Sequence, residues 1–441
     1  MDPESLCPCD ASSEEALRCR AHMEHLKECF KIAGVINSSL ELDEVLELIM
    51  SASRAVLRAE ACSLLLADPA TDELVFTVAQ GPVADQLRDS HRVKKGSGIA
   101  GYVFETGEPQ LIEDVYEDPR FHPGFDRRTG YRTRSMLCVP IQAKERVIGV
   151  SQVINRQDGL PFTREDLETL LLLCSHAAVA IENARMHQAL LQRQRMESDL
   201  AFARSIQLSF LPQESPVVPG FRFEAHYQAA LEVGGDFYDF IALDDNRLGI
   251  LIGDVSGKGV SSALYMARLT SDFRLLAIRH KDPADLVARV NDVLCERSSH
   301  GMFVTLCYLV LDVSDSSLSY INAGHIPPFR WNALDPDRTV HLLRQGGGPP
   351  TGILPGMRYE LGQERLEPGD RLLLTTDGLT EAMNGSGERF GMDRLERVLK
   401  DAGPSCGEAR EAILRAVDRF VGSNAQSDDL TVVLMGCEAR P

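Results

Sequence analysis

The chain has 441 residues, of which 44% are hydrophobic and 25% are charged. This length predicts two or three domains, and the hydrophobic share is large enough to give each of them a core. The formal net charge of −19 argues against direct binding to nucleic acid or to anionic membranes, because like charges repel at long range.

The sequence predicts a cytoplasmic protein without a membrane span. No apolar segment follows a basic start, and the most apolar helical stretch, "TLLLLCSHAAVAI", is short for a bilayer and contains His176. Eleven cysteines are scattered along the chain, several in apolar runs, as expected for buried thiols in a reducing compartment. Residues 1–28 are predicted to be an N-terminal tail or helix. Their "CPCD" has no second close cysteine pair to complete a zinc site.

The next region is predicted to combine helices with an antiparallel sheet, which places the chain in the α+β class. "LELDEVLELIMSASRAVL" is amphipathic with helical spacing, and "ACSLLLAD" and "ELVFTVAQ" have the pattern of short strands. "RSMLCVPIQAKERVIGVSQVINR" is typical of a two-stranded hairpin.

Four stretches of this region, "GSGIAGYVFETGEPQLIEDV", "DPRFHPGFDRRTGYRTRSMLCVPI", "VIGVSQVINR" and "FTREDLETL", resemble a GAF domain over residues 29–184. The resemblance implies a pocket for a small-molecule ligand, whose identity the sequence does not give. Asn155, Arg156, Phe162 and Asp166 are similar to a motif of cyclic-nucleotide-binding GAF domains, although Arg156 stands where that motif has Lys. The same residues recur in GAF domains as plain structure, so both interpretations stay open.

Residues 162–211 contain no Gly and no Pro, which predicts one long helix or two abutting ones. Residues that are apolar except for Gln188 recur there in steps of three and four, the spacing of a coiled-coil seam: Leu167, Leu170, Cys174, Ala177, Ile181, Ala184, Gln188 and Leu191. We therefore expect residues 185–212 to form a coiled-coil connecting helix in a homodimer. The alternative is an amphipathic helix that packs on its own domain.

Four acidic sites of the C-terminal half lie at predicted strand ends beside small or turn-forming residues. They are Asp236 in "EVGGDFYDF", Asp254 in "LIGDVSGKG", Asp377 in "LLLTTDGLTEAM" and the pair Asp428 and Asp429 in "QSDDLTVVLMG". A single such Asp is usually a turn former or helix cap. Four suggest a shared site, where carboxylates about 5 Å apart would repel by roughly 3 kcal/mol at an effective dielectric near 20. Cations would have to balance them, and all-oxygen ligands suit Mg²⁺ or Mn²⁺.

Five motifs in this order, "VGGDFYDF", "GDVSGKGVSSAL", "NAGHIPP", "TTDGLTEA" and "SDDLTVVL", resemble the PPM-type serine/threonine phosphatases, in particular the bacterial branch that includes SpoIIE and RsbU. The segment "ARSIQLSFLP" just before them resembles the helix that enters those domains. The resemblance implies an αββα sandwich over residues 213–438, with two divalent cations, Mn²⁺ or Mg²⁺, at one end of the paired sheets.

The resemblance also implies roles for the acids. Asp254 would bridge both metals and, with Asp236, is a catalytic candidate. Asp429 stands where the wider superfamily usually has Asn, so we favour Asp428 as the ligand of that pair. The implied metal-binding residues are Asp236, Asp254, Val255 through its carbonyl, Asp377 and Asp428.

The activity implied by the resemblance is hydrolysis of phosphoserine or phosphothreonine on a regulatory partner protein, under control of the GAF sensor. In this branch the partner is usually an anti-sigma-factor antagonist of the STAS type. A catalytically inactive PPM fold that only binds a partner is the alternative, and the intact set of acids argues against it. "GDVSGKG" is one residue short of a P-loop, and "VGGDFYDF" has Phe237 where diguanylate cyclases need an acid.

Two further residues lie in these motifs. His325 is more typical of a structural loop histidine than of a proton donor. For Lys258, contact with substrate phosphate and a solvated role both stay open.

Overall fold

The computed structural model describes residues 41–86, 92–297 and 301–439. The chain forms two compact units, Met1–Arg195 and Met196–Pro441. The predicted tail and its "CPCD" lie outside the described residues. The division falls inside a long helix, α5, so each unit is treated by itself.

The described residues of the first unit form a six-stranded antiparallel sheet in the order β3-β2-β1-β6-β5-β4. Its strands are β1 (Ala59–Ala67), β2 (Leu74–Gln80), β3 (Arg92–Val93), β4 (Gln110–Ile112), β5 (Met136–Ala143) and β6 (Arg146–Arg156). A helical turn, η2 (Ala84–Gln86), follows β2. The predicted hairpin is β5 and β6, with pairing from Met136 opposite Ile154 to Ala143 opposite Arg146.

Helices cover both faces of this sheet. One core joins the sheet to α2 (Leu42–Val56) and to the first part of α5 (Arg164–Leu208). A second core on the other face includes α3 (Gly98–Thr106), and α4 (Gly124–Thr129) lies in the loop that leads to β5. This arrangement confirms the predicted α+β class for the N-terminal half.

The helix α5 has two parts of different character. Leu170, Cys174, Ala177 and Ile181 of the predicted seam are buried against the first unit's sheet. Between Arg185 and Ile206, in contrast, no described residue is buried. The first part of the seam therefore packs on its own domain. The second part of α5 leaves apolar side chains exposed: Met186, Leu190, Leu191, Met196, Phe202 and Ile206. By length and composition α5 could cross a membrane, but half of its most apolar window is buried in the protein, as in an ordinary core helix.

The second unit is a sandwich of two antiparallel five-stranded sheets, in the orders β14-β11-β10-β9-β8 and β13-β12-β15-β16-β7. The first sheet contains β8 (Phe237–Ala242), β9 (Arg247–Val255), β10 (Val304–Asp312), β11 (Ser317–Ala323) and β14 (Gly362–Arg365). The second contains β7 (Phe221–Gln228), β12 (Phe329–Asn332), β13 (His341–Leu342), β15 (Asp370–Thr375) and β16 (Leu430–Cys437).

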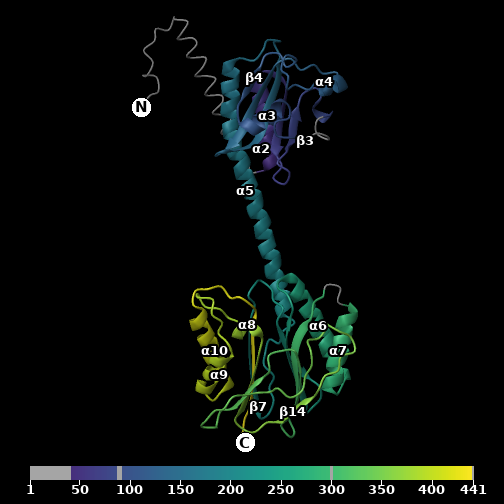
Figure 1. Ribbon diagram of the computed structural model, residues 1–441, viewed down its shortest axis with the longest axis vertical. Coiled ribbons are helices and arrows are strands. Elements are labelled where there is room, and N and C mark those ends of the chain that lie inside the picture. The colour runs from purple at the N-terminus through teal and green to yellow at the C-terminus, as the bar shows by residue number, and fades with distance from the viewer. Residues whose placement is uncertain (1–40, 87–91, 298–300, 440–441) are drawn as a thin grey trace, which may run out of the picture. The chain divides into compact units, whose positions relative to one another are not determined.

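Pairs of helices cover the outer faces of this sandwich. Figure 1 shows α6 (Val260–Arg279) and α7 (Pro283–Arg297) along one side, and α9 (Met392–Asp401) and α10 (Cys406–Val421) along the other. Central strands such as β9 are nearly continuous apolar runs because one face meets helices and the other meets the second sheet. These four layers are the predicted αββα architecture.

Candidate metal centre

The predicted acids come from both sheets of the sandwich. Asp254 and Val255 are the last residues of β9, and Asp236 precedes the neighbouring strand β8. In the other sheet, Asp377 begins the short helix α8 (Asp377–Thr380) after β15, and Asp428 lies two residues before β16.

Asp236 joins the two sheets. Its Oδ2 accepts hydrogen bonds from the hydroxyls of Thr376 and Thr431, each at 2.6 Å. The backbone N–H of Thr431 in turn donates to Thr376 Oγ1 at 3.1 Å. The sequence reasoning did not single out these two threonines. The available signal was their position in the motifs "TTDG" and "DLTVV", directly beside the acids.

Burial and mutual repulsion raise the pKa values of the central acids. Burial is the largest cause for Asp236, whose pKa is well above its ordinary value, and the charge of Asp254 adds to it. Burial, then the charges of Asp377 and Asp428, raise the pKa of Asp254 to about 7. The pKa of Asp377 is raised by burial and then by Asp428. The acids are therefore close enough to oppose one another's ionisation, which a cation between them would relieve.

In this structure the acidic side chains of the candidate centre do not form a complete metal-coordination shell. Within residues 41–86, 92–297 and 301–439, no group of three or more Asp, Glu, His or Cys is arranged around one metal position. Asp428 instead contacts the ammonium of Lys258, with 2.8 Å between Oδ2 and Nζ. Lys258 also donates to the carbonyl of Ser427 at 2.7 Å. A positive charge thus already lies at this carboxylate.

The two adjacent acids before β16 have different surroundings. Asp429 is buried, and its carboxylate accepts hydrogen bonds from the N–H groups of Ala230 at 2.8 Å and Gly235 at 2.6 Å. Asp429 is therefore occupied in holding the loop that carries Asp236. Asp428 is partly exposed, and it stays the predicted ligand of the pair.

A glycine keeps the approach to the candidate ligands open. A Cβ atom on Gly235 would lie 2.8 Å from the Val255 carbonyl oxygen and 3.3 Å from Asp254 Oδ1. Val255 is paired with Val304 across the sheet, and the N–H of Val304 donates to the Thr351 carbonyl at 2.9 Å. Carboxylates with a carbonyl in a glycine-lined space are the donor set that Mg²⁺ and Mn²⁺ prefer, so the residues present fit such ions.

The end of α5 is hydrogen-bonded to the loop that precedes Asp236. Gln207 is 5% exposed, its Nε2 donates to the Gly234 carbonyl at 2.5 Å, and its Oε1 accepts from the Gly234 N–H at 3.2 Å. Sequence reasoning quoted the segment that contains Gln207 but gave this residue no role.

His325 has structural contacts. Its ring Nδ1 lies 2.9 Å from Thr305 Oγ1, and its backbone N–H donates to Asn322 Oδ1 at 2.7 Å. Burial lowers the pKa of His325 to about 4, so the ring is neutral at neutral pH. This agrees with the structural interpretation, because a neutral imidazole with such a low pKa is a poor proton donor.

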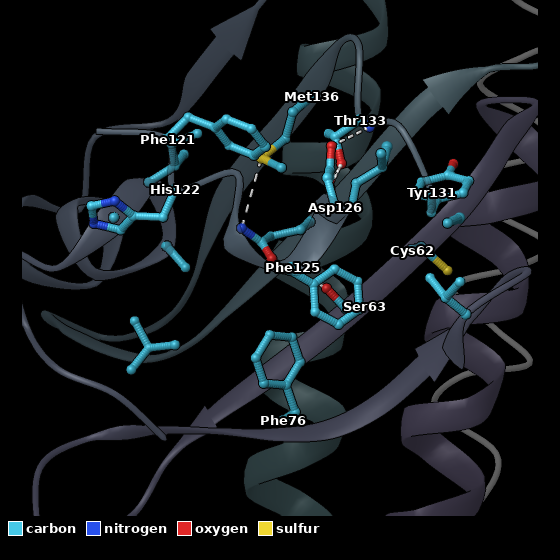
Figure 2. Close-up of a pocket in the computed structure, with 18 of the residues that line it drawn as sticks. Cys62, Ser63, Phe76, Phe121, His122, Phe125, Asp126, Tyr131, Thr133 and Met136 are labelled. Atoms are coloured by element: carbon cyan, nitrogen blue, oxygen red, sulfur yellow. Dashed lines mark hydrogen bonds between the residues drawn. The ribbon is translucent and has the colours of Figure 1, made fainter. Parts of the chain in front are cut away.

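The first unit contains a cavity of about 300 Å³ (Figure 2). Figure 2 shows the rings of Phe76, Phe121 and Phe125 around it. Asp126, at its wall, accepts hydrogen bonds from the N–H and hydroxyl of Thr133 at 2.7 and 2.9 Å, so its carboxylate is already engaged. A mainly apolar cavity of this size suits a small molecule.

The residues similar to the cyclic-nucleotide motif are outside the lining of this cavity. Asn155 Oδ1 accepts from the N–H groups of Arg134 and Ser135, and its amide donates to the Arg132 carbonyl. Arg156 pairs with Asp166 at 3.2 Å, and Phe162 belongs to a hydrophobic core. These contacts favour the structural interpretation of the motif.

Comparison with known families agrees with both halves of the fold. The family model "Stage II sporulation protein E (SpoIIE)" matches residues 244–438, and the "GAF domain" model matches residues 41–181. The chain thus combines a GAF domain with a SpoIIE-type domain. This confirms both predicted resemblances.

Known relatives match parts of the chain. Protein IcfG of Synechocystis sp. is 31% identical over 262 residues, which cover 53% of this chain and 41% of IcfG. The phosphoserine phosphatase RsbP of Bacillus subtilis is 29% identical over 248 residues, which cover 54% of this chain and 57% of RsbP. The chain thus spans about half the length of these two relatives. The SiaA-PP2C domain of Pseudomonas aeruginosa, 22% identical with a TM-score of 0.50, covers 56% of this chain and 98% of its own and shares the SpoIIE-type fold.

Proposed function

We propose that the SpoIIE-type domain hydrolyses phosphoserine or phosphothreonine on a protein, with two divalent cations, Mn²⁺ or Mg²⁺, as cofactors. The observation that carries this proposal is the proximity of acids from both sheets. The charge of Asp254 raises the pKa of Asp236, and the charges of Asp377 and Asp428 raise that of Asp254. The name of the relative RsbP, a phosphoserine phosphatase, supports the same reaction class.

Asp236, Asp254, Asp377, Asp428 and the Val255 carbonyl would hold the cations. When bound, divalent cations lower the pKa of water and neutralise charge on a phosphoryl group. The chain's own residues fix the acids for this task. Thr376 and Thr431 hold the Asp236 carboxylate through two hydroxyls, while Asp429 fixes the backbone in front of it.

A metal-dependence assay tests this function. Purified full-length protein is incubated with p-nitrophenyl phosphate and with a phosphoserine protein, with Mn²⁺, with Mg²⁺ and with a chelator. We expect phosphate release that needs a divalent cation and falls at least 1,000-fold in Asp254→Asn, since carboxylate ligands carry the electrostatic stabilisation. Asp401→Asn, an exposed acid at the end of α9, is the matched control. Activity that survives chelation or Asp254→Asn would contradict the metal mechanism. No phosphate release with either cation would instead leave a non-catalytic binding module.

The natural partner is proposed to be a STAS-type anti-sigma-factor antagonist that carries phosphoserine, in the cytoplasm. A comparison of phosphoproteins in cells with and without the gene tests this directly. The partner should be the protein whose serine phosphorylation rises when the gene is removed and falls when the wild-type gene, but not Asp254→Asn, is returned.

Control by the GAF domain is proposed to pass through α5. A small molecule bound in the cavity of about 300 Å³ would alter the first part of this helix, whose residues share a core with the sheet. Exposed apolar side chains of its second part, such as Leu190 and Leu191, would pair with a second copy in a homodimer. At the far end, Gln207 contacts the loop that carries Asp236.

A further inference from the structure

Beside the candidate metal centre, the surface has a hollow of about 560 Å³ at the start of α6. Lys258, one of its lining residues, contacts Asp428. Ser262, another, has its Cβ 3.2 Å from the position that a Cβ on Gly235 would take. The hollow therefore borders the candidate metal centre.

The charge of the hollow differs from that of the whole chain. The sequence has 65 acidic and 46 basic residues, yet the described residues that line the hollow include Lys258 and Arg268 and no acid. Such a wall attracts an anionic segment in an otherwise acidic protein.

Arg268 is only weakly paired. Its Nε lies 3.5 Å from Asp272 Oδ2, at the long end of an ion pair, and its side chain is 40% exposed. A partly exposed guanidinium is suited to contact a second carboxylate through charge-assisted hydrogen bonds.

The same wall presents an apolar contact. Leu264 lines the hollow one turn before Arg268, and its side chain is 68% exposed. A residue four positions earlier on a helix lies on the same face, so a bound chain would meet Leu264 and Arg268 together.

We propose that this hollow binds the phosphorylated segment of the protein substrate, and that Arg268 selects an acidic side chain near the phosphorylated residue while Leu264 packs on an apolar one. The inference rests on the proposed phosphatase function and names the substrate class for that site: a phosphoprotein segment with flanking acidic and apolar residues.

A charge-swap experiment tests the selection. Fluorescent phosphoserine peptides carry Glu or Lys at each position around the phosphoserine, and their binding to the full chain is measured by anisotropy, along with phosphate release. At one position, the wild-type protein should favour Glu over Lys about tenfold, the size of one charge-assisted contact. Arg268→Glu should reverse that preference and leave hydrolysis of p-nitrophenyl phosphate unchanged.

Leu264→Asp should weaken binding of all peptides at least fivefold. The matched control is Leu275→Asp on the same helix, 53% exposed and outside the lining of the hollow, which should bind as wild type does. The proposal is overturned if no position discriminates Glu from Lys, or if Arg268→Glu keeps the wild-type preference. A protein that binds the peptides selectively but releases no phosphate would refute the phosphatase function and leave the docking surface intact.

Discussion

Gln207, near the end of the helix α5, exchanges two hydrogen bonds with the backbone of Gly234, two residues before Asp236. Both partners are buried. The side chain thus links the helix that leaves the GAF domain to the loop that carries a candidate metal ligand. A displacement of this part of α5 would break or strain both bonds, because a buried amide has no water to replace them.

Gln207→Ala should therefore weaken the response to metal. Loss of the two buried hydrogen bonds costs about 1–2 kcal/mol. If this cost weakens metal binding by the loop that carries Asp236, the Mn²⁺ concentration for half-maximal phosphatase activity should rise about 5- to 30-fold. A metal titration of activity measures this. Gln213→Ala is the control, because Gln213 donates only to the carbonyls of Leu208 and Leu211 at the helix end. Equal metal responses of Gln207→Ala and wild type would remove any role of this contact in activity.

Thr376→Val and Thr431→Val test the support of Asp236. Each substitution keeps the shape of the side chain and removes a hydroxyl that donates to Asp236 Oδ2. A carboxylate with fewer donors is harder to ionise, so each variant should lose at least tenfold in activity at saturating substrate, and high Mn²⁺ should recover part of it. Thr380→Val, which removes only a bond to the Asp377 carbonyl, serves as control. The two effects should not be additive, because both threonines act on one oxygen atom.

The sequence was sufficient to predict the fold and the neighbourhood of the acids, but not the groups that hold them. Asp236 and Asp254 are recognisable because they end apolar runs beside glycines, a local pattern. Thr376 and Thr431 are distant from Asp236 in the chain, by 140 and 195 positions, so no local pattern reports their hydrogen bonds. Gln207 lies in a helical segment where a polar residue usually faces solvent, and only the tertiary structure shows that it is buried.

Stability without metal should fall as pH rises. The pKa of Asp254 is about 7 in the folded protein against an ordinary value of 3.8, so the folded state binds more protons between these pH values. Stability is then full below about pH 4 and declines up to about pH 7, by on the order of 2–4 kcal/mol for this group. Chelator-treated protein should melt at lower temperature at pH 8 than at pH 5.5, and Mn²⁺ should reduce the difference. Asp254→Asn should stabilise the metal-free protein at pH 8, whereas Asp401→Asn should not.

Transmission along α5 should depend on helical phase. One residue inserted after Arg193 rotates everything beyond it by about 100° relative to the GAF domain, while seven inserted residues restore the phase within about 20°. We expect the single insertion to change basal phosphatase activity at least threefold and the seven-residue insertion to leave it near the wild-type value. Equal activity of all three proteins on p-nitrophenyl phosphate and on a phosphoserine protein would argue against control through the helix. Light scattering of each variant reports whether the proposed dimer forms.

Asn155→Ala should destabilise the GAF domain rather than abolish ligand binding. The residue is 1% exposed, has a positive φ of 52° and bonds to several backbone groups around β5. Alanine loses these bonds and is disfavoured in that backbone conformation, at a combined cost of about 3 kcal/mol. Hydrogen exchange of peptides from β5 and β6 in the full chain should accelerate by about two orders of magnitude. Phe125→Ala, at the wall of the cavity, is the matched opposite. Phe125→Ala should weaken small-molecule binding while hydrogen exchange in β6 stays near the wild-type rate. If Asn155→Ala instead weakened ligand binding and left exchange in β6 unchanged, Asn155 would be assigned to the ligand site.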